Sequence, residues 1–133
     1  MPRPCRLALG AGLAAGLLLL LPISAEAHAL VVRSDPAAGA SLLRVPRTVT
    51  ITFSEAPEAG RSYIHVVDAS NKTVSLGAAR PVSSNRLELT ESLEPLLNGV
   101  YTVRWKTISA DDGHASAGSF TFGVGPSAYA ASA

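Results

Sequence analysis

The chain has 133 residues, of which 47% are hydrophobic and 16% are charged, and its formal net charge at pH 7 is +1. This length fits one domain with its flanking segments. Because Lys and Arg are not in excess, the sequence lacks the electrostatic footprint that nucleic acid or an anionic membrane surface requires, and we expect neither partner.

The first 27 residues are typical of a cleaved secretory signal peptide. Arg3 and Arg6 precede an apolar run over residues 7–21, and the small residues of the Ala-Glu-Ala sequence at 25–27 form a cleavage site. The apolar run is shorter than the ~20 residues that span a bilayer. We therefore predict a mature chain that begins at His28 and is periplasmic or otherwise extracytoplasmic.

Cleavage would also change the composition of the chain. Nine basic and nine acidic residues would remain, because Arg3, Arg6 and Glu26 belong to the leader. The sole cysteine, Cys5, and the sole methionine, Met1, would be lost as well. Cys5 precedes the apolar run instead of closing it, which argues against a lipoprotein. A domain of about 100 residues without disulfides is large enough to be stabilised by its core alone.

The mature chain shows the period-two alternation of half-buried β-strands. Val49, Ile51 and Phe53 alternate with threonines, as burial of one face of a strand requires. The same alternation recurs at residues 63–67, 87–89, 101–105 and 120–124, with turn residues between these segments. The pattern predicts an all-β fold, an antiparallel Greek-key β-sandwich of the immunoglobulin type or a barrel.

The remaining segments carry weaker signals. Only Glu91 to Leu97 has the pattern of a helical turn, and Pro95 limits it to a short piece or a loop. Residues 125–133 are small and polar, so we expect a flexible tail after a domain that covers residues 28–124. The period-two aromatic residues are expected in the core, not in a cofactor site; they are Tyr101, Trp105 and Phe122.

A histidine at a new N-terminus offers two nitrogens to one metal ion, the α-amine and the imidazole Nδ1. The ordinary pKa of an α-amine is about 7.7 to 8.0, so a divalent cation can displace its proton near neutral pH. Taken alone, His28 is better explained as a solvated residue that happens to follow the cleavage site.

A second cluster is the sequence SADDGH at residues 109–114. If this segment is extended, Asp112 and His114 lie on one face and can converge on an ion, whereas Asp111 points away. Taken alone, the segment is better explained as a hydrophilic Asp-Gly turn. With His28 it supplies three nitrogens and one oxygen, a donor set that suits Cu(II), with Ni(II) and Zn(II) as competitors.

Three stretches, in the same order, resemble the CopC family of exported copper-binding proteins, and together they cover most of residues 28–124. They are HALVVRSDPAAGASL, VTITFSEAPE and LNGVYTVRWKTISADDGHASAGSFTFGV. The resemblance implies a cupredoxin-like Greek-key fold. It also implies one Cu(II) per chain, bound by the amine and imidazole of His28, the carboxylate of Asp112 and the imidazole of His114.

The resemblance carries two further expectations. Glu55 is a candidate for orienting a copper ligand from beyond the metal, although a solvated strand end explains this residue equally well. Family members are often linked with a CopD-type inner-membrane copper transporter, which is therefore an expected partner. The chain lacks the Met-rich segment of members that also carry a Cu(I) site, so we expect a single Cu(II) site.

We thus predict a copper carrier or buffer for copper homeostasis or resistance, monomeric and not an enzyme. A copper mono-oxygenase with an N-terminal histidine is one alternative, but such an enzyme needs an open coordination position that the carboxylate would fill. The other is a metal-free immunoglobulin-like adhesion or assembly module. We expect His65 to be a surface or hydrogen-bonded histidine and not a ligand.

Overall fold

The computed structural model of the protein describes residues 2, 4 and 29–126. In this part of the chain there are eight β-strands and one short 3-10 turn, η1 (Ala59–Arg61). The strands are β1 (Val31–Asp35), β2 (Ser41–Leu42), β3 (Thr48–Phe53), β4 (Tyr63–Val67), β5 (Arg80–Val82), β6 (Asn85–Ser92), β7 (Gly99–Ile108) and β8 (Ala115–Val124). The all-β prediction is confirmed.

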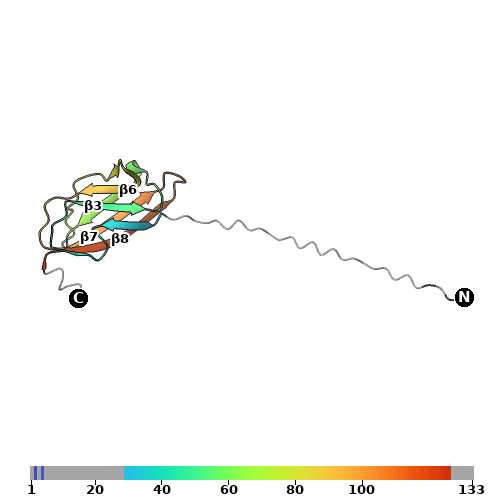
Figure 1. Ribbon diagram of the computed structural model, residues 1–133, viewed down its shortest axis with the longest axis horizontal. Helices are drawn as coiled ribbons and strands as arrows, with labels where there is room; N and C mark the ends of the chain where they lie inside the picture. Colours follow the sequence, from blue (N-terminus) through green and yellow to red (C-terminus); the bar gives the residue numbers. More distant parts are fainter. Residues whose placement is uncertain (1, 3, 5–28, 127–133) are drawn as a thin grey trace.

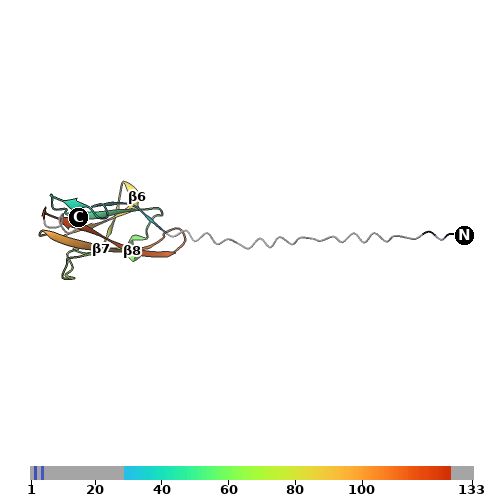
Figure 2. The ribbon, with the colours of Figure 1, turned by 90° about the horizontal axis from the view of Figure 1, so that it is seen from below.

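The strands form two four-stranded sheets, in the orders β1-β3-β6-β5 and β2-β8-β7-β4. Figure 1 labels β3 and β6 of the first sheet and β7 and β8 of the second. Figure 2 shows them as two layers, with β6 in one and β7 and β8 in the other. The pairing is antiparallel except between β2 and β8, which run parallel. The purely antiparallel prediction misses this pair because the chain crosses from one sheet to the other between β1 and β2.

The core lies between the sheets and is built from the alternation seen in the sequence. Val49, Ile51 and Phe53 of β3 are fully buried, and the threonines between them are not. The aromatic residues predicted for the core join them. Tyr101 stacks on Phe122 with ring centroids 5.5 Å apart, and Trp105 meets Phe53 edge-on at the same separation.

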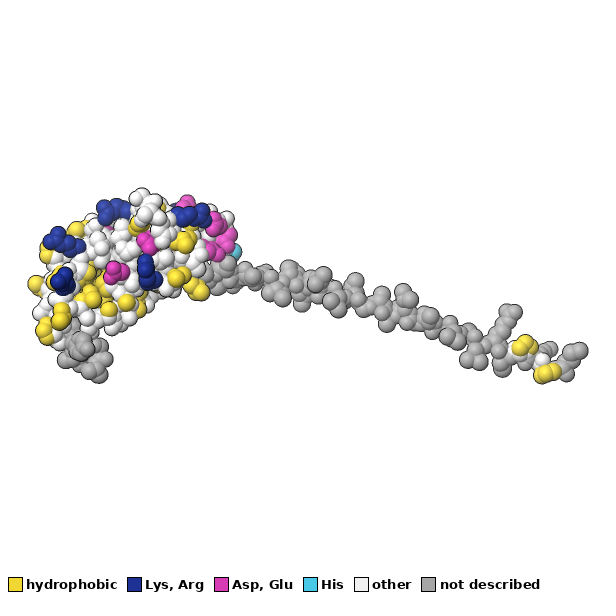
Figure 3. Space-filling view, in the orientation of Figure 1, with side chains coloured by type: hydrophobic (Ala, Val, Ile, Leu, Met, Phe, Trp, Pro, Cys, Tyr) yellow, Lys and Arg dark blue, Asp and Glu magenta, His cyan; other side chains and the backbone are white. Residues whose placement is uncertain are grey.

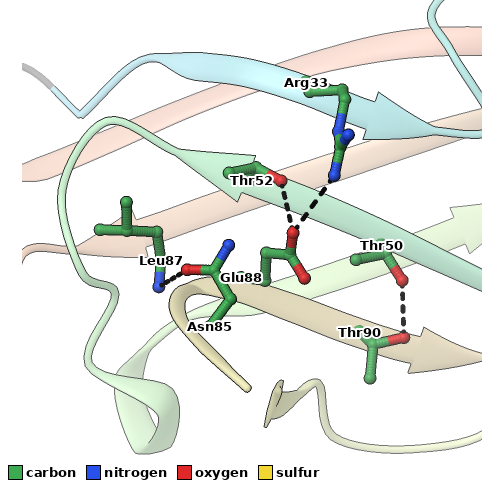
Figure 4. Close-up of polar contacts among 7 residues, drawn as sticks. All are labelled: Arg33, Thr50, Thr52, Asn85, Leu87, Glu88 and Thr90. Atoms are coloured by element: carbon green, nitrogen blue, oxygen red, sulfur yellow. Dashed lines mark hydrogen bonds and ion pairs between the residues drawn. The ribbon is translucent and has the colours of Figure 1, made fainter. Parts of the chain in front are cut away.

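The outer face of the first sheet is polar, as one-sided burial requires. Glu88 Oε1 accepts hydrogen bonds from Thr52 Oγ1 at 3.1 Å and from Arg33 Nη2 at 3.4 Å (Figure 4). The hydroxyls of Thr50 and Thr90 lie 3.0 Å apart on the same face. These cross-strand contacts fix the register of β1, β3 and β6.

Residues 91–97 form no helical turn, and the loop alternative holds for residues 94–97. Glu91 and Ser92 end strand β6, and in the described residues the helical turn lies at η1 instead. Glu91 is only 2% exposed, and its Oε2 atom has no hydrogen-bond partner among the described residues. Burial raises the pKa of Glu91, while the backbone amides of Ser92, Gly77 and Leu76 and the charge of Arg80 lower it.

A pH-dependent stability follows from Glu91. Because its pKa is higher in the fold than in the unfolded chain, ionising it costs stability as the pH rises above about 4.5. We expect Glu91→Gln to gain free energy of unfolding relative to the unaltered protein between pH 4 and pH 7. Urea unfolding at several pH values measures this. Glu94→Gln is the control. The Glu94 carboxylate is partly exposed and paired with Lys72, so its replacement should show no such gain.

Candidate metal centre

Three chain segments meet at one end of the sandwich, where β1 begins and β3 and β7 end. Leu30 is held against Ser54 by two hydrogen bonds of 2.8 Å, from Leu30 N to Ser54 Oγ and from Ser54 N to Leu30 O. Ala110 N donates to Ala56 O, also at 2.8 Å. Glu55 therefore lies between the start of the described domain and the β7–β8 loop.

The β7–β8 loop, residues 109–114, is a tight turn. Gly113 N donates to Ser109 O at 2.9 Å, and Ser109 N donates to His114 O at 2.9 Å. Gly113 has φ +74°, a conformation that glycine adopts without strain. The segment is therefore not extended, the condition under which alternating faces would bring Asp112 and His114 together, because the Asp-Gly pair closes a turn here.

The turn nevertheless brings the predicted pair together. Asp112 Oδ2 lies 2.9 Å from His114 Nδ1, and Asp112 Oδ1 accepts the backbone N–H of His114 at 3.0 Å. Both side chains remain accessible, with 37% of Asp112 and 53% of His114 exposed. The structure thus sets a carboxylate oxygen and an imidazole nitrogen side by side at the surface.

Electrostatics keep this carboxylate ionised. The side-chain hydrogen bond to His114, the backbone N–H of His114 and the hydroxyl of Ser109 lower the pKa of Asp112 to about 2. Asp112 therefore stays an anion, and a donor for a cation, at any pH well above 2.

Asp111 takes a different direction from Asp112. Its Oδ1 atom lies 3.9 Å from Arg86 Nη2, and its backbone N–H is bound by Ser109 Oγ at 3.2 Å. The geometry separates the two neighbouring aspartates, one facing His114 and the other facing Arg86. Sequence reasoning missed both Ser109 and Arg86, although a serine two residues before an aspartate is a known turn former.

Glu55 has an unsatisfied carboxylate. Its Oε2 atom is buried and has no hydrogen-bond partner among the described residues. A buried carboxylate oxygen without a partner is costly, and such an atom in a native protein calls for an explanation. Glu55 lies between Ser54, which is hydrogen-bonded to Leu30, and Ala56, which is hydrogen-bonded to Ala110. A cation or an N–H donor at this position would satisfy the Oε2 atom.

The other predicted positions fall elsewhere. His28 lies outside the described residues, and so do most of the proposed leader and most of the proposed tail. His65 is exposed on β4, and its Nε2 lies 3.0 Å from Thr73 Oγ1, so the prediction of a hydrogen-bonded surface histidine is confirmed. Among residues 2, 4 and 29–126, no three His, Cys, Asp or Glu side chains gather in a way that could hold a metal ion.

The end of the domain that holds the β7–β8 loop is acidic. Figure 3 shows Asp and Glu side chains gathered there, with a histidine beside them. Negative charge around a site attracts metal cations.

No helix in the described part of the chain is long and apolar enough to cross a membrane.

The described part of the chain is thus a two-sheet β-sandwich that carries an Asp–His pair in one end loop. The chain belongs to the CopC family, whose CopC domain matches residues 31–125. Proteins of this family are periplasmic copper-binding proteins with roles in copper resistance and transport, and they are not enzymes.

Individual relatives agree with this assignment. Protein YobA of Escherichia coli K12 is 35% identical over 109 residues, which cover 79% of this chain and 85% of YobA. Copper transport protein CutJ of Bacillus subtilis is 33% identical over 109 residues, which cover 81% of this chain but only 20% of CutJ. The chain thus corresponds to about a fifth of that longer protein.

Solved structures show the same fold. CopC from Methylosinus trichosporium OB3b superposes with a TM-score of 0.69 at 29% identity, covering 74% of this chain and 95% of that one. PcoC, described as a methionine-rich copper resistance protein from Escherichia coli, superposes with a TM-score of 0.65 at 25% identity, covering 74% and 100%. The resemblance seen in the sequence is confirmed.

Proposed function

We propose that the mature chain carries one Cu(II) ion outside the cytoplasm as a copper carrier or buffer. In this proposal the ligands are the amine and imidazole of His28, the carboxylate of Asp112 and the imidazole of His114. The observation that supports it most is the contact of 2.9 Å between Asp112 Oδ2 and His114 Nδ1.

That separation suits two neighbouring ligands of one metal ion. Metal–nitrogen and metal–oxygen bonds of about 2.0 Å, set at right angles, place their donor atoms about 2.8 Å apart. Copper would therefore replace a proton between Asp112 and His114 with little movement of either side chain. The turn closed by Gly113 pre-organises this half of the site.

The other half of the site comes from the chain that enters β1. Ala29 is 2% exposed, and Leu30 is bonded to Ser54. His28 is joined directly to Ala29, and consecutive Cα atoms are about 3.8 Å apart. Position 28 is therefore covalently joined to a segment that lies beside Glu55. On the other side of Glu55, Ala56 O accepts a hydrogen bond from Ala110 N.

Glu55 fits a supporting role in this site. Its buried Oε2 atom has no hydrogen-bond partner within residues 29–126 and is available to accept a hydrogen bond from an N–H of a ligand such as His28. A carboxylate in this role orients the ligand and raises its basicity. The proposal thus explains why a charged oxygen is buried at the end of β3.

The donor types favour Cu(II) over Cu(I). Nitrogen and carboxylate oxygen suit Cu(II), whereas Cu(I) selects thiolate and thioether sulfur. The chain's one Met and one Cys are Met1 and Cys5, both in the proposed leader of residues 1–27. We therefore propose a single Cu(II) site in a domain of residues 28–124, followed by a flexible tail at 125–133. We further propose that the protein is a monomer and passes copper to a CopD-type membrane partner.

Proton competition tests this ligand set. Copper must displace protons from the amine and imidazole of His28 and from the imidazole of His114, whereas Asp112, with a pKa of about 2, offers none above pH 4. We expect the affinity for Cu(II) to fall by at least about tenfold per pH unit below about pH 6. Competition titrations against a chelator of known affinity measure this. A constant affinity between about pH 8 and pH 5 would indicate a site dominated by carboxylates.

A further inference from the structure

The end of the domain opposite the copper site carries protruding apolar side chains. Leu43 and Leu97 are 83% and 81% exposed, and Val45 and Val100 are 48% and 38% exposed. An exposed leucine alone needs no explanation, but four large apolar side chains at one end form a patch, which marks an interaction site. We call this patch, with Arg44 and Arg47, the apolar tip.

Strand pairing places the two halves of the apolar tip together. Leu42 pairs with Val124 of β8, and Val124 pairs with Gly99 at the start of β7. The loop that begins at Leu43 and the loop that precedes Gly99 therefore project from the same end of the second sheet. A shallow pocket between them is lined from both sides, by Val45, Pro46 and Arg47 and by residues 93–96.

The apolar tip carries two arginines, and the carboxylates of Asp68 and Glu94 line a pocket beside Leu97 and Val100. Arg44 and Arg47 are exposed, and neither side chain makes an ion pair or hydrogen bond with a residue in the described part of the chain. The nearby carboxylate of Glu94 is already paired with Lys72 at 3.2 Å. Figure 3 shows hydrophobic and basic side chains at this end of the visible face, while Asp and Glu side chains gather at the other end, where a basic side chain is also visible.

The two arginines revise the expectation drawn from composition. Net charge excluded an anionic membrane surface as a partner, but it averages over all side chains and does not describe the apolar tip, where Arg44 and Arg47 are exposed. We propose that the apolar tip docks the domain on an anionic lipid surface. Leu43 and Leu97 enter the headgroup region, and Arg44 and Arg47 contact the lipid phosphates.

The shape of the apolar tip favours a lipid surface over a protein partner. A protein interface needs a matched, largely buried surface, whereas the two leucines stand out from separate loops. Separate protruding apolar side chains flanked by arginines can each insert into an interface independently. The ten residues of β7 separate the apolar tip from the β7–β8 loop. At about 3.3 Å per residue, docking would hold the copper end about 30 Å from the lipid.

Vesicle flotation of residues 28–133 tests this proposal, which does not depend on copper. One vesicle set contains phosphatidylethanolamine and phosphatidylglycerol, and the other contains phosphatidylcholine alone. We expect binding to the anionic set only, weakened by added salt. Arg44→Ala with Arg47→Ala should weaken it roughly fivefold for each arginine, and Leu43→Ala with Leu97→Ala should weaken it at least about tenfold.

Matched controls keep the test specific. Leu76→Ala removes a leucine that is 63% exposed and lies between β4 and β5, and Arg61→Ala removes an arginine of η1 near the copper end. Both should leave vesicle binding unchanged, and all variants should keep their circular dichroism spectrum. The proposal is overturned if neither vesicle set binds the protein, if both bind it equally, or if the controls weaken binding as much as the apolar-tip variants.

Discussion

Replacing His114 with alanine in the mature chain is expected to weaken Cu(II) binding by at least about 100-fold. Losing a residue that merely supports a ligand costs 10- to 100-fold in metal affinity, so losing the ligand itself should cost at least as much. Because the side chain is 53% exposed in a surface turn, the substitution should leave the fold intact. Competition titration gives the affinity, and circular dichroism verifies the fold.

The neighbouring aspartates provide a matched pair for the same experiment. Asp112→Asn and Asp111→Asn remove the same charge one residue apart, but only Asp112 faces His114, whereas Asp111 faces Arg86. We expect Asp112→Asn to weaken Cu(II) binding by about tenfold or more and Asp111→Asn to change it less than about threefold. Equal losses from the two variants would mean that general negative charge, not the Asp112–His114 pair, attracts the metal.

Replacing Phe53 with alanine should lower the free energy of unfolding by about 3 to 5 kcal/mol. Phe53 is completely buried and packs edge-on against Trp105, so alanine leaves a cavity between the sheets. Tyr63→Ala is the control, because Tyr63 is an aromatic residue with 47% of its surface exposed, and its loss should cost far less. Denaturant unfolding followed by the fluorescence of Trp105 measures both. Similar losses from the two variants would contradict the assignment of the core.

Much of the fold was predictable because burial of one strand face leaves a period-two pattern. The alternation at Val49, Ile51 and Phe53 predicted both the strand and its inward face, since threonines occupy the outward positions. The parallel pairing of β2 was not predictable, because two residues are too few to carry a pattern. Glu91 was misread because a charged residue rarely occupies a buried strand position.

Of the candidate site, the sequence predicted that Asp112 and His114 lie together, but not the geometry that brings them together. Spacing singled out Asp112 and His114, but for the wrong reason, since the turn and not an extended strand brings them into contact. The unsatisfied oxygen of Glu55 depends on segments that are distant in the sequence, so no local pattern could reveal it. The apolar tip likewise depends on which loops the sheets bring together. The net charge of the chain carries no information about that arrangement.

An EPR-monitored Cu(II) titration of residues 28–133 tests the central claim most directly, run beside the same protein with one extra residue before His28. The extension removes the chelate formed by the terminal amine and imidazole but leaves Asp112 and His114 in place. We predict that the native start binds one copper with a nitrogen-rich spectrum and that the extended form binds far more weakly. Identical titrations and spectra for the two forms would contradict the account, because His28 would then not be a ligand.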